Sequence, residues 1–229
     1  PHVRNYIKRQ LQLELLGEVP VLSIRTEPLQ NPVNRLAKRL FDLTFSSLFL
    51  LTIFPFMYLI VGLIIKITSP GPIFFKQERN GENGKIFKCY KFRSMKVNAL
   101  SDSLQATKND PRKTKFGNFL RKSNLDELPQ FINVFKGEMS IVGPRPHMLK
   151  HTEEYSQLIN KYMMRHLVKP GITGWAQVTG YRGETKELSQ MEGRVRRDLW
   201  YIENWTFLLD IRIMIKTVTN MFRGEKNAY

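Results

Sequence analysis

The longest apolar segment of the chain contains no charged residue. It runs from residue 43 to residue 65 and reads LTFSSLFLLTIFPFMYLIVGLII. A straight helix of this length, at about 1.5 Å per residue, would just cross a bilayer core of about 30 Å. A membrane-spanning helix is therefore the first interpretation, and a buried helix of a soluble protein is another.

Two features of this segment favour a helix that enters the membrane and returns. Pro55 lies near its middle, where it removes a helical hydrogen bond and clashes with the preceding turn. Basic residues flank both ends, whereas a single span usually carries Lys and Arg mainly on one side; they are Arg35, Lys38 and Arg39 before it and Lys66, Lys76 and Arg79 after it. Each arm has about 18 Å of helix, too short to cross. We therefore predict a re-entrant helical hairpin over residues 35–68, bent at Pro55.

The segments on either side of this hairpin have β character. Before it, the run from Val19 to Ile24 predicts a short strand, and we interpret residues 1–34 as a lead-in or the tail of an upstream domain. After it, SPGP at 69–72 ends the helix, and GENG at 81–84 separates IFFKQER from KIFKCYKFRSM as a hairpin turn does. The fold class that we predict is mainly α with a small β hairpin.

The charge of the chain predicts an anionic partner. It contains 36 Lys and Arg against 20 Asp and Glu, a formal net charge of +16. Residues 76–122 alone contain 13 Lys and Arg against 4 Asp and Glu, which fits a basic face on anionic lipid or a pocket for phosphate groups. We expect no nucleic-acid partner, because a reader of DNA or RNA does not need the uncharged segment. Cys89 is the only cysteine, which excludes an intrachain disulfide and a cysteine metal cluster.

Two adjacent acids, Asp126 and Glu127, lie in KSNLDELPQF at 122–131. Ser123 with Asp126 three positions later matches a capping box, which predicts a helix start near residues 125–129 and explains the acids without chemistry. A second interpretation starts from the neighbouring cations in Arg121 and in VGPRP at 142–146. Cations keep a carboxylate ionised and also bind phosphate. One acid would then attack phosphorus while the other holds a divalent metal, in a site for phosphoryl transfer.

Five long motifs make the chain recognisable. It resembles the bacterial sugar transferases, the polyprenyl-phosphate hexose-1-phosphate transferases of the monotopic phosphoglycosyl transferase superfamily, over roughly residues 32–229. RGET and the terminal NAY are most similar to the undecaprenyl-phosphate glucose phosphotransferases of that family. The motifs, in order, are SPGPIFFKQERNG, YKFRSMK, FGNFLRKSNLDELPQFINVFKGEMSIVGPRPH, HLVKPGITGWAQVTGYRGET and DLWYIENWTFLLDIRI.

The resemblance implies a mechanism. Asp126 is expected to attack the β-phosphate of a UDP-sugar, releasing UMP and leaving a phosphosugar-aspartyl enzyme that undecaprenyl phosphate then attacks. Glu127 is expected to bind Mg²⁺. The remaining site residues are expected to bind phosphate groups: Arg121 and Arg145 match family arginines, and Lys91 and Arg93 in YKFRSM are weaker candidates.

The resemblance also implies a location and an architecture. The chain is expected to be a monotopic protein of the bacterial inner membrane, its partners being the lipid bilayer, a UDP-sugar and undecaprenyl phosphate, with residues 69–229 as a catalytic domain on the cytoplasmic face. Trp200, Tyr201 and Trp205 predict an interfacial amphipathic helix in that domain. One departure from the family is IFPF at residues 53–56, which lacks the Ser-Pro often found at the helix break.

Several questions stay open at this point. The donor is expected to carry glucose, with galactose or another hexose as alternatives, and the product to initiate an exopolysaccharide or another surface glycan. A non-enzymatic basic protein of the membrane surface is a further alternative, which would not need the two acids. The pathway, the oligomeric state and the sequence upstream of Pro1 are left open, with a homodimer as one option for the oligomeric state.

Overall fold

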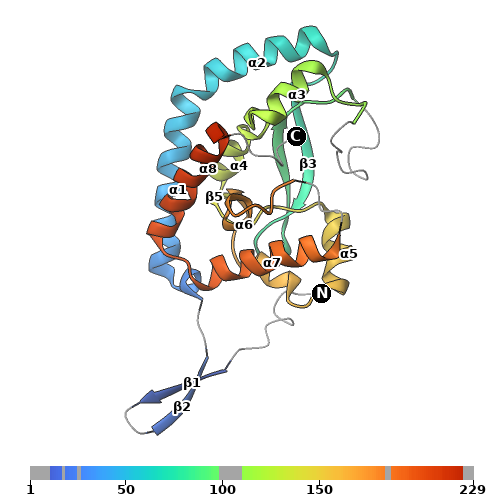
Figure 1. Ribbon diagram of the computed structural model, residues 1–229. Helices are drawn as coiled ribbons and strands as arrows, with labels where there is room; N and C mark the ends of the chain where they lie inside the picture. The colour runs from blue at the N-terminus through green and yellow to red at the C-terminus, as the bar shows by residue number, and fades with distance from the viewer. Residues whose placement is uncertain (1–10, 17–18, 25–26, 98–109, 184–186, 224–229) are drawn as a thin grey trace.

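The computed structural model describes residues 11–16, 19–24, 27–97, 110–183 and 187–223 (Figure 1). The first half of the described chain contains β1 (Leu11–Leu16), β2 (Val19–Ile24), η2 (Pro28–Gln30), α1 (Pro32–Thr52), α2 (Phe54–Thr68), β3 (Phe74–Asn80), η3 (Glu82–Gly84), β4 (Ile86–Phe92) and α3 (Lys115–Lys122). The second half contains η4 (Leu125–Glu127), α4 (Gln130–Lys136), β5 (Ser140–Val142), α5 (Leu149–Leu158), η5 (Tyr162–Leu167), β6 (Gly171–Thr173), α6 (Trp175–Val178), α7 (Leu188–Glu203) and α8 (Phe207–Arg223).

The described part of the chain is mainly helical, as predicted, and its strands form separate pairs. β3 and β4 make the predicted antiparallel hairpin, in a register that places Phe74 opposite Phe92 and Asn80 opposite Ile86. The predicted strand from Val19 to Ile24 is also present, as β2 paired with β1. The sequence did not predict β1 or the short parallel pair of β5 and β6. This parallel pair matters for the site, since the loop after β5 carries Arg145.

α1 starts where its local sequence favours a helix start. The side chain of Asn31 accepts a hydrogen bond from the Val33 backbone N–H at 2.9 Å, and Pro32 occupies the first helical position. The helix therefore begins at Pro32, three residues before the predicted start of the membrane segment at residue 35.

The predicted bend at Pro55 is confirmed. α1 and α2 meet at a bend of 56°, with Pro55 in the first turn of α2 and Ile53 between the two helices. The proline has no N–H to donate to the preceding turn. The Thr52 hydroxyl donates to the Leu48 carbonyl at 2.7 Å, a bond that often accompanies bent helices. Thr52 thus supports the bend locally, although the Ser-Pro of the family is missing here. We call the bent pair α1–α2 the elbow.

α1 is fixed to the rest of the molecule by buried polar contacts. Asp42 is buried and accepts a hydrogen bond from the Ile141 backbone N–H of β5 at 3.0 Å. Lys38 forms an ion pair of 2.5 Å with Asp210 of α8, whose carboxylate also accepts hydrogen bonds from Tyr201 and Trp205. A buried charge needs such partners. Asp210 therefore joins α1, α7 and α8.

The prediction of an interfacial helix is wrong for two of its three aromatic residues. Tyr201 and Trp205 are 1% and 5% exposed and belong to the largest hydrophobic core cluster. Trp200 is 42% exposed and stacks on Trp175 with ring centroids 5.0 Å apart. Tyr201 and Trp205 instead bring their polar atoms to Asp210, which is why they point inward.

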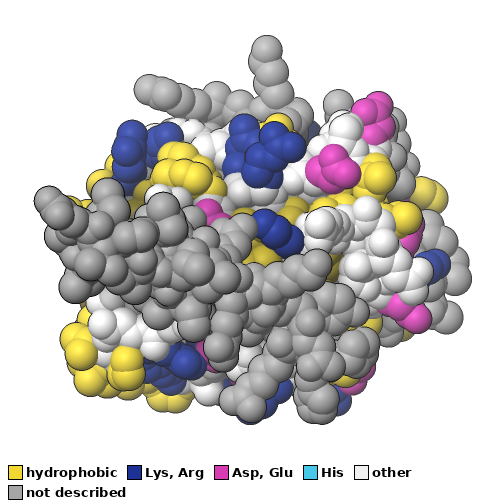
Figure 2. All heavy atoms as spheres, turned by 90° about the horizontal axis from the view of Figure 1, so that it is seen from below, with side chains coloured by type: hydrophobic (Ala, Val, Ile, Leu, Met, Phe, Trp, Pro, Cys, Tyr) yellow, Lys and Arg dark blue, Asp and Glu magenta, His cyan; other side chains and the backbone are white. Residues whose placement is uncertain are grey.

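Large hydrophobic side chains are exposed along both arms of the elbow and along α8; they are Leu36, Leu40, Leu48, Leu51, Phe56, Leu59, Ile60, Leu63, Ile67, Leu208, Ile215, Val218 and Met221. Figure 1 shows α1 along one edge of the molecule with α8 beside it and α2 turning across the top. Within the described residues, none of the helices by itself has the length and apolar composition of a membrane span, whereas the bent pair α1–α2 has both. Figure 2 shows a face where Lys and Arg side chains gather in separate groups next to hydrophobic ones.

Candidate active site

The acids Asp126 and Glu127 lie in the single 3-10 turn η4, between α3 and α4. Helical structure begins near the predicted position, but the capping box is wrong. The Ser123 hydroxyl donates to the Phe119 and Leu120 carbonyls at 2.8 and 3.2 Å and so belongs to the end of α3. Asn124 follows in the left-handed conformation, with φ of 59°, and turns the chain into η4. The acids therefore need an explanation other than a cap at Ser123.

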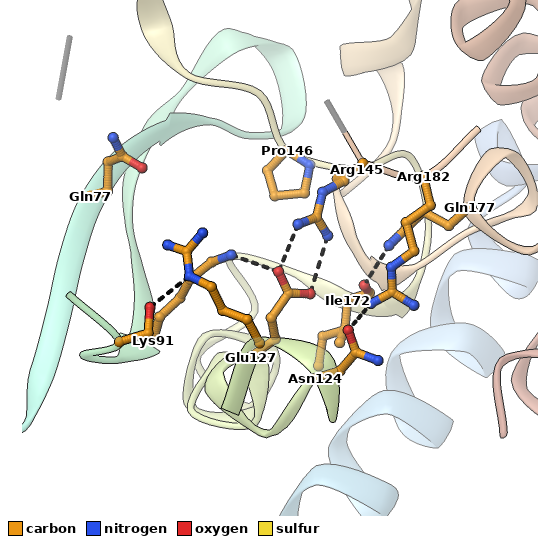
Figure 3. A network of polar contacts seen from close by, with 12 residues as sticks. Gln77, Lys91, Asn124, Glu127, Arg145, Pro146, Ile172, Gln177 and Arg182 are labelled. Carbon is orange, nitrogen blue, oxygen red and sulfur yellow. Dashed lines mark hydrogen bonds and ion pairs between the residues drawn. The ribbon is translucent and has the colours of Figure 1, made fainter. Parts of the chain in front are cut away.

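Glu127 is surrounded by cations. Arg145 donates two hydrogen bonds to its carboxylate, at 3.1 Å to Oε2 and 2.6 Å to Oε1, and Lys91 Nζ lies 2.6 Å from Oε1. Figure 3 shows the two basic side chains reaching Glu127 from two sides. The Glu127 residue is 7% exposed, and a buried carboxylate requires compensation of this kind.

Asp126 has a different environment, although it is equally buried at 6% exposure. Among the described residues, no donor makes a hydrogen bond or ion pair with its carboxylate. Lys91, Arg121 and Arg145 are near enough to favour its charged form. Asp126 is thus an acid in a cationic site whose oxygens are available to a ligand.

The pKa values of the two acids move apart. Burial, opposed by Lys91, raises the pKa of Asp126 above its ordinary value, and the negative charge of Glu127 raises it further. Burial also acts to raise the pKa of Glu127, but Arg145 and Lys91 outweigh it and hold this pKa well below the ordinary value. Neighbouring acids with opposite shifts are suited to different roles.

Lys91 is placed by an unusual contact between β4 and α4. The buried amide of Asn133 on α4 accepts a hydrogen bond from the Tyr90 N–H at 3.0 Å and donates one to the Lys88 carbonyl at 2.8 Å. Asn133 therefore pairs with the edge of β4 as a further strand would. The strand that carries Lys91 is locked to the helix that follows Glu127.

Arg145 is placed by the loop after β5. Gly143 comes so close to β6 that an added Cβ would lie 2.5 Å from the Lys169 carbonyl oxygen, so this position requires glycine. Behind the loop, Arg165 donates to the Arg145 carbonyl at 2.9 Å and to Asp198 of α7 at 2.8 Å. The buried pair Arg165–Asp198 thus supports the backbone of Arg145.

Of the other predicted residues, one acts on Asp126 and two contact other parts of the structure. Arg121 Nε donates to the Ser94 hydroxyl at 2.8 Å, and the charge of Arg121 acts on Asp126. Arg93 is buried and donates instead to the backbone carbonyls of Ser69 and Pro70, where it holds the loop that follows α2. Pro55 belongs to the elbow between α1 and α2.

Arg182 is a residue of the site that the sequence did not assign. Its guanidinium donates to the Asn124 side chain beside the two acids (Figure 3), and its charge acts on Glu127. The sequence offered one signal for Arg182, its position between Gly180 and Gly183 in the segment GYRGET.

The carboxylates at this site are of the ligand type that a hard divalent cation prefers. Within the described ranges there is no group of three or more His, Cys, Asp or Glu side chains able to hold a metal ion. Mg²⁺ is usually bound by one or two carboxylates together with substrate phosphates, and Glu127 would supply one such carboxylate next to Asp126. Glu127 would have to exchange a contact with Lys91 or Arg145 for the metal.

Comparison with known proteins decides the family. A family model described as "Bacterial sugar transferase" matches residues 33–224. The chain belongs to the bacterial sugar transferase family. The described site residues lie within this match, and so does the elbow except for Pro32, the first residue of α1.

Relatives within this family share much of the sequence. The chain is 54% identical over 221 residues to a protein of Escherichia coli (strain K12), covering 95% of this chain and 47% of that protein, and 50% identical over 223 residues to one of Xanthomonas campestris pv. campestris, covering 94% and 45%. Both are named UDP-glucose:undecaprenyl-phosphate glucose-1-phosphate transferase. The chain spans about half the length of these relatives. It also matches the "Exopolysaccharide production protein PSS" of Rhizobium leguminosarum bv. phaseoli, with 45% identity over 194 residues that cover 82% of this chain and 96% of that protein.

Proposed function

We propose that this chain transfers a hexose 1-phosphate, with glucose as the preferred hexose, from a UDP-sugar to undecaprenyl phosphate. The observation that carries the proposal is the pairing of Asp126, whose oxygens are available, with Glu127, which Arg145 and Lys91 hold in its charged form. The names of the relatives support the donor and the acceptor. The product would initiate an exopolysaccharide or another surface glycan.

Asp126 acts as the nucleophile in this proposal. One carboxylate oxygen forms a bond to the β-phosphorus of the UDP-sugar, and the bond from this phosphorus to the oxygen bridging the α-phosphate breaks. UMP leaves with that oxygen and the electron pair. A phosphate oxygen of undecaprenyl phosphate then attacks the same phosphorus, the bond to Asp126 breaks, and the carboxylate is restored.

The cations bind and orient the diphosphate. Arg145 presents a planar pair of donors suited to phosphate oxygens, while Lys91 and Arg121 add positive charge next to Asp126. Glu127 has two successive roles. It holds Arg145 and Lys91 in place before substrate binds, and it would then take part in binding Mg²⁺. When bound, Mg²⁺ would neutralise phosphate charge that otherwise resists attack.

We also propose that the elbow of α1 and α2 enters the cytoplasmic leaflet of the bacterial inner membrane and returns. The exposed apolar side chains of both arms and the 56° bend support this, as do the basic residues at both ends. Such an elbow would keep the site on the cytoplasmic face, where nucleotide sugars occur, and near the phosphate of a membrane-embedded acceptor.

The test is release of UMP by the purified protein in lipid nanodiscs with undecaprenyl phosphate, Mg²⁺ and a panel of UDP-sugars. We expect release with UDP-glucose and transfer of the hexose phosphate to the lipid. A preference for another UDP-hexose would change the assigned sugar and keep the reaction. No UMP with any donor would contradict the proposal and favour a non-enzymatic protein of the membrane surface.

A further inference from the structure

A cationic pocket lies at the start of α1, and none of its lining residues belongs to the active site described above. Its volume is about 490 Å³. Its charged lining consists of Arg35, Lys38, Arg39, Asp42, Glu82 and Lys169. Lys169 comes from the segment before β6, so the pocket is built by segments far apart in the sequence.

The negative charges near this pocket already have partners. Glu82 pairs with Arg35 at 2.8 Å, and Lys38 pairs with Asp210 at 2.5 Å. Asp42 accepts the Ile141 N–H, and burial raises its pKa. The cations that remain are Arg39 and Lys169.

Arg39 and Lys169 lie next to each other, and the carboxylates whose charges act on Lys169, Asp42 and Glu82, are already engaged by other partners. Both reach Gly137 at the end of α4, where an added Cβ would lie 3.4 Å from the Arg39 guanidinium carbon and 3.6 Å from Lys169 Nζ. Arg39 donates to the Val134 and Phe135 carbonyls, which carry no net charge. In the described part of the chain, the Lys169 ammonium makes no hydrogen bond or ion pair. Burial and the charge of Arg39 lower the pKa of Lys169, and they outweigh Glu82 and Asp42, which act to raise it. Two neighbouring cations of this kind are stabilised by an anion between them.

The remaining walls and the position of the pocket indicate the kind of anion. Leu29, Leu36 and Val168 line it, and Leu36 is 59% exposed on the outer side of α1. Arg39 precedes the uncharged segment at residue 43 by one helical turn, about 6 Å of rise. If α1 enters a bilayer at that segment, the pocket lies at the depth of the lipid headgroups.

We propose that this pocket binds a phosphate ester, with Lys169 and Arg39 contacting the phosphate oxygens and the leucines contacting an attached apolar group. A membrane phospholipid supplies both parts, and a soluble phosphate compound supplies the first part only. The site is separate from the proposed transfer reaction. Its occupation would fix the depth and tilt of α1 by tying its first turns to the headgroup layer.

The test measures lipids retained by the purified chain in native mass spectrometry after exchange from phosphatidylglycerol vesicles into detergent. We expect the wild type to retain phosphatidylglycerol and Lys169→Gln to bind it about ten-fold more weakly or worse, the usual cost of losing a charge-assisted hydrogen bond. Lys169→Arg should restore retention, because it restores the charge. Lys150→Gln, on the exposed side of α5, is the matched control and should retain lipid as the wild type does.

Thermal unfolding with added inorganic phosphate distinguishes the two sources. Stabilisation of the wild type but not of Lys169→Gln, without lipid retention, would support the site with a soluble ligand. Equal lipid retention and equal phosphate response in the wild type and Lys169→Gln would overturn the proposal. UMP release, measured in the same samples, reports separately on the active site: its failure with lipid retention intact would count against the proposed function alone.

Discussion

Arg145 donates hydrogen bonds to both carboxylate oxygens of Glu127. Arg145 lies in the loop after β5, and Glu127 lies in the turn before α4. This bidentate pair leaves the neighbouring acid, Asp126, as the carboxylate without a bonded cation in the described site. The same guanidinium geometry suits a diphosphate. The pair therefore holds the site together, and in the proposed reaction Arg145 would exchange the carboxylate of Glu127 for a phosphate of the substrate.

Arg145 is expected to contribute mainly to substrate binding. Arg145→Ala should raise the KM for the UDP-sugar about ten-fold or more, because a bidentate charged contact is lost. Arg145→Lys should restore little, since an ammonium lacks the planar pair of donors. Initial rates of UMP release check this, with Lys150→Ala as the control. An unchanged KM in Arg145→Ala would mean that this side chain serves the fold and not the substrate.

The pH profile should report Asp126. Because its pKa is raised, its nucleophilic form is lost as the pH falls through a value above the ordinary 3.8, and it is fully present above that value. Glu127→Gln removes a neighbouring negative charge and frees Lys91 and Arg145 to act on Asp126. The acidic limb of kcat/KM should therefore shift to lower pH in this variant, even though the rate itself falls. A limb that stays in place or shifts upward would contradict the assignment.

Asp198 is expected to act as a positioning residue through Arg165. Asp198→Asn leaves the buried Arg165 charge without its carboxylate, which should cost about 3 to 5 kcal/mol of folding stability. Arg165 also holds the Arg145 carbonyl, so the KM for the UDP-sugar should rise at temperatures well below unfolding. Thermal unfolding and a KM-against-kcat comparison measure the two effects. A destabilised variant with wild-type KM would assign Asp198 to the core alone.

The elbow should place both of its ends on one side of the membrane. Cysteines at Asn34 and Lys76 are expected to react with an impermeant thiol reagent from the same face, and the buried Cys89 gives little background. Labelling from opposite faces would establish a span. Pro55→Ala should straighten the segment and change the labelling pattern of the two cysteines. An unchanged labelling pattern would mean that Thr52 and the basic residues at both ends set the bend.

The sequence predicts those parts of the fold that depend on local chemistry. The β3–β4 hairpin followed from two apolar runs around GENG, and the bend from the missing N–H of Pro55. The cationic surroundings of Glu127 were predicted from the basic residues near it in the sequence and from the family resemblance.

The features that were missed depend on contacts between distant segments or on an ambiguous residue. Ser123 bonds backward to α3, and a serine has the same local signature at either end of a helix. The pair Arg165–Asp198 spans 33 residues without a local signal. Tyr201 and Trp205 face inward because Asp210 offers them a buried acceptor, which helical spacing alone does not indicate.

The most direct test of the covalent role of Asp126 is mass spectrometry of the wild type, quenched after incubation with UDP-glucose and Mg²⁺ without lipid acceptor. Trypsin should release Ser123–Lys136, which contains both acids, and we predict a hexose-phosphate adduct on this peptide that fragmentation assigns to Asp126. Asp126→Asn, which keeps shape but not the nucleophile, should show neither the adduct nor UMP release, and addition of undecaprenyl phosphate should discharge the wild-type adduct. An adduct on another residue, or substantial UMP release by Asp126→Asn, would contradict the account.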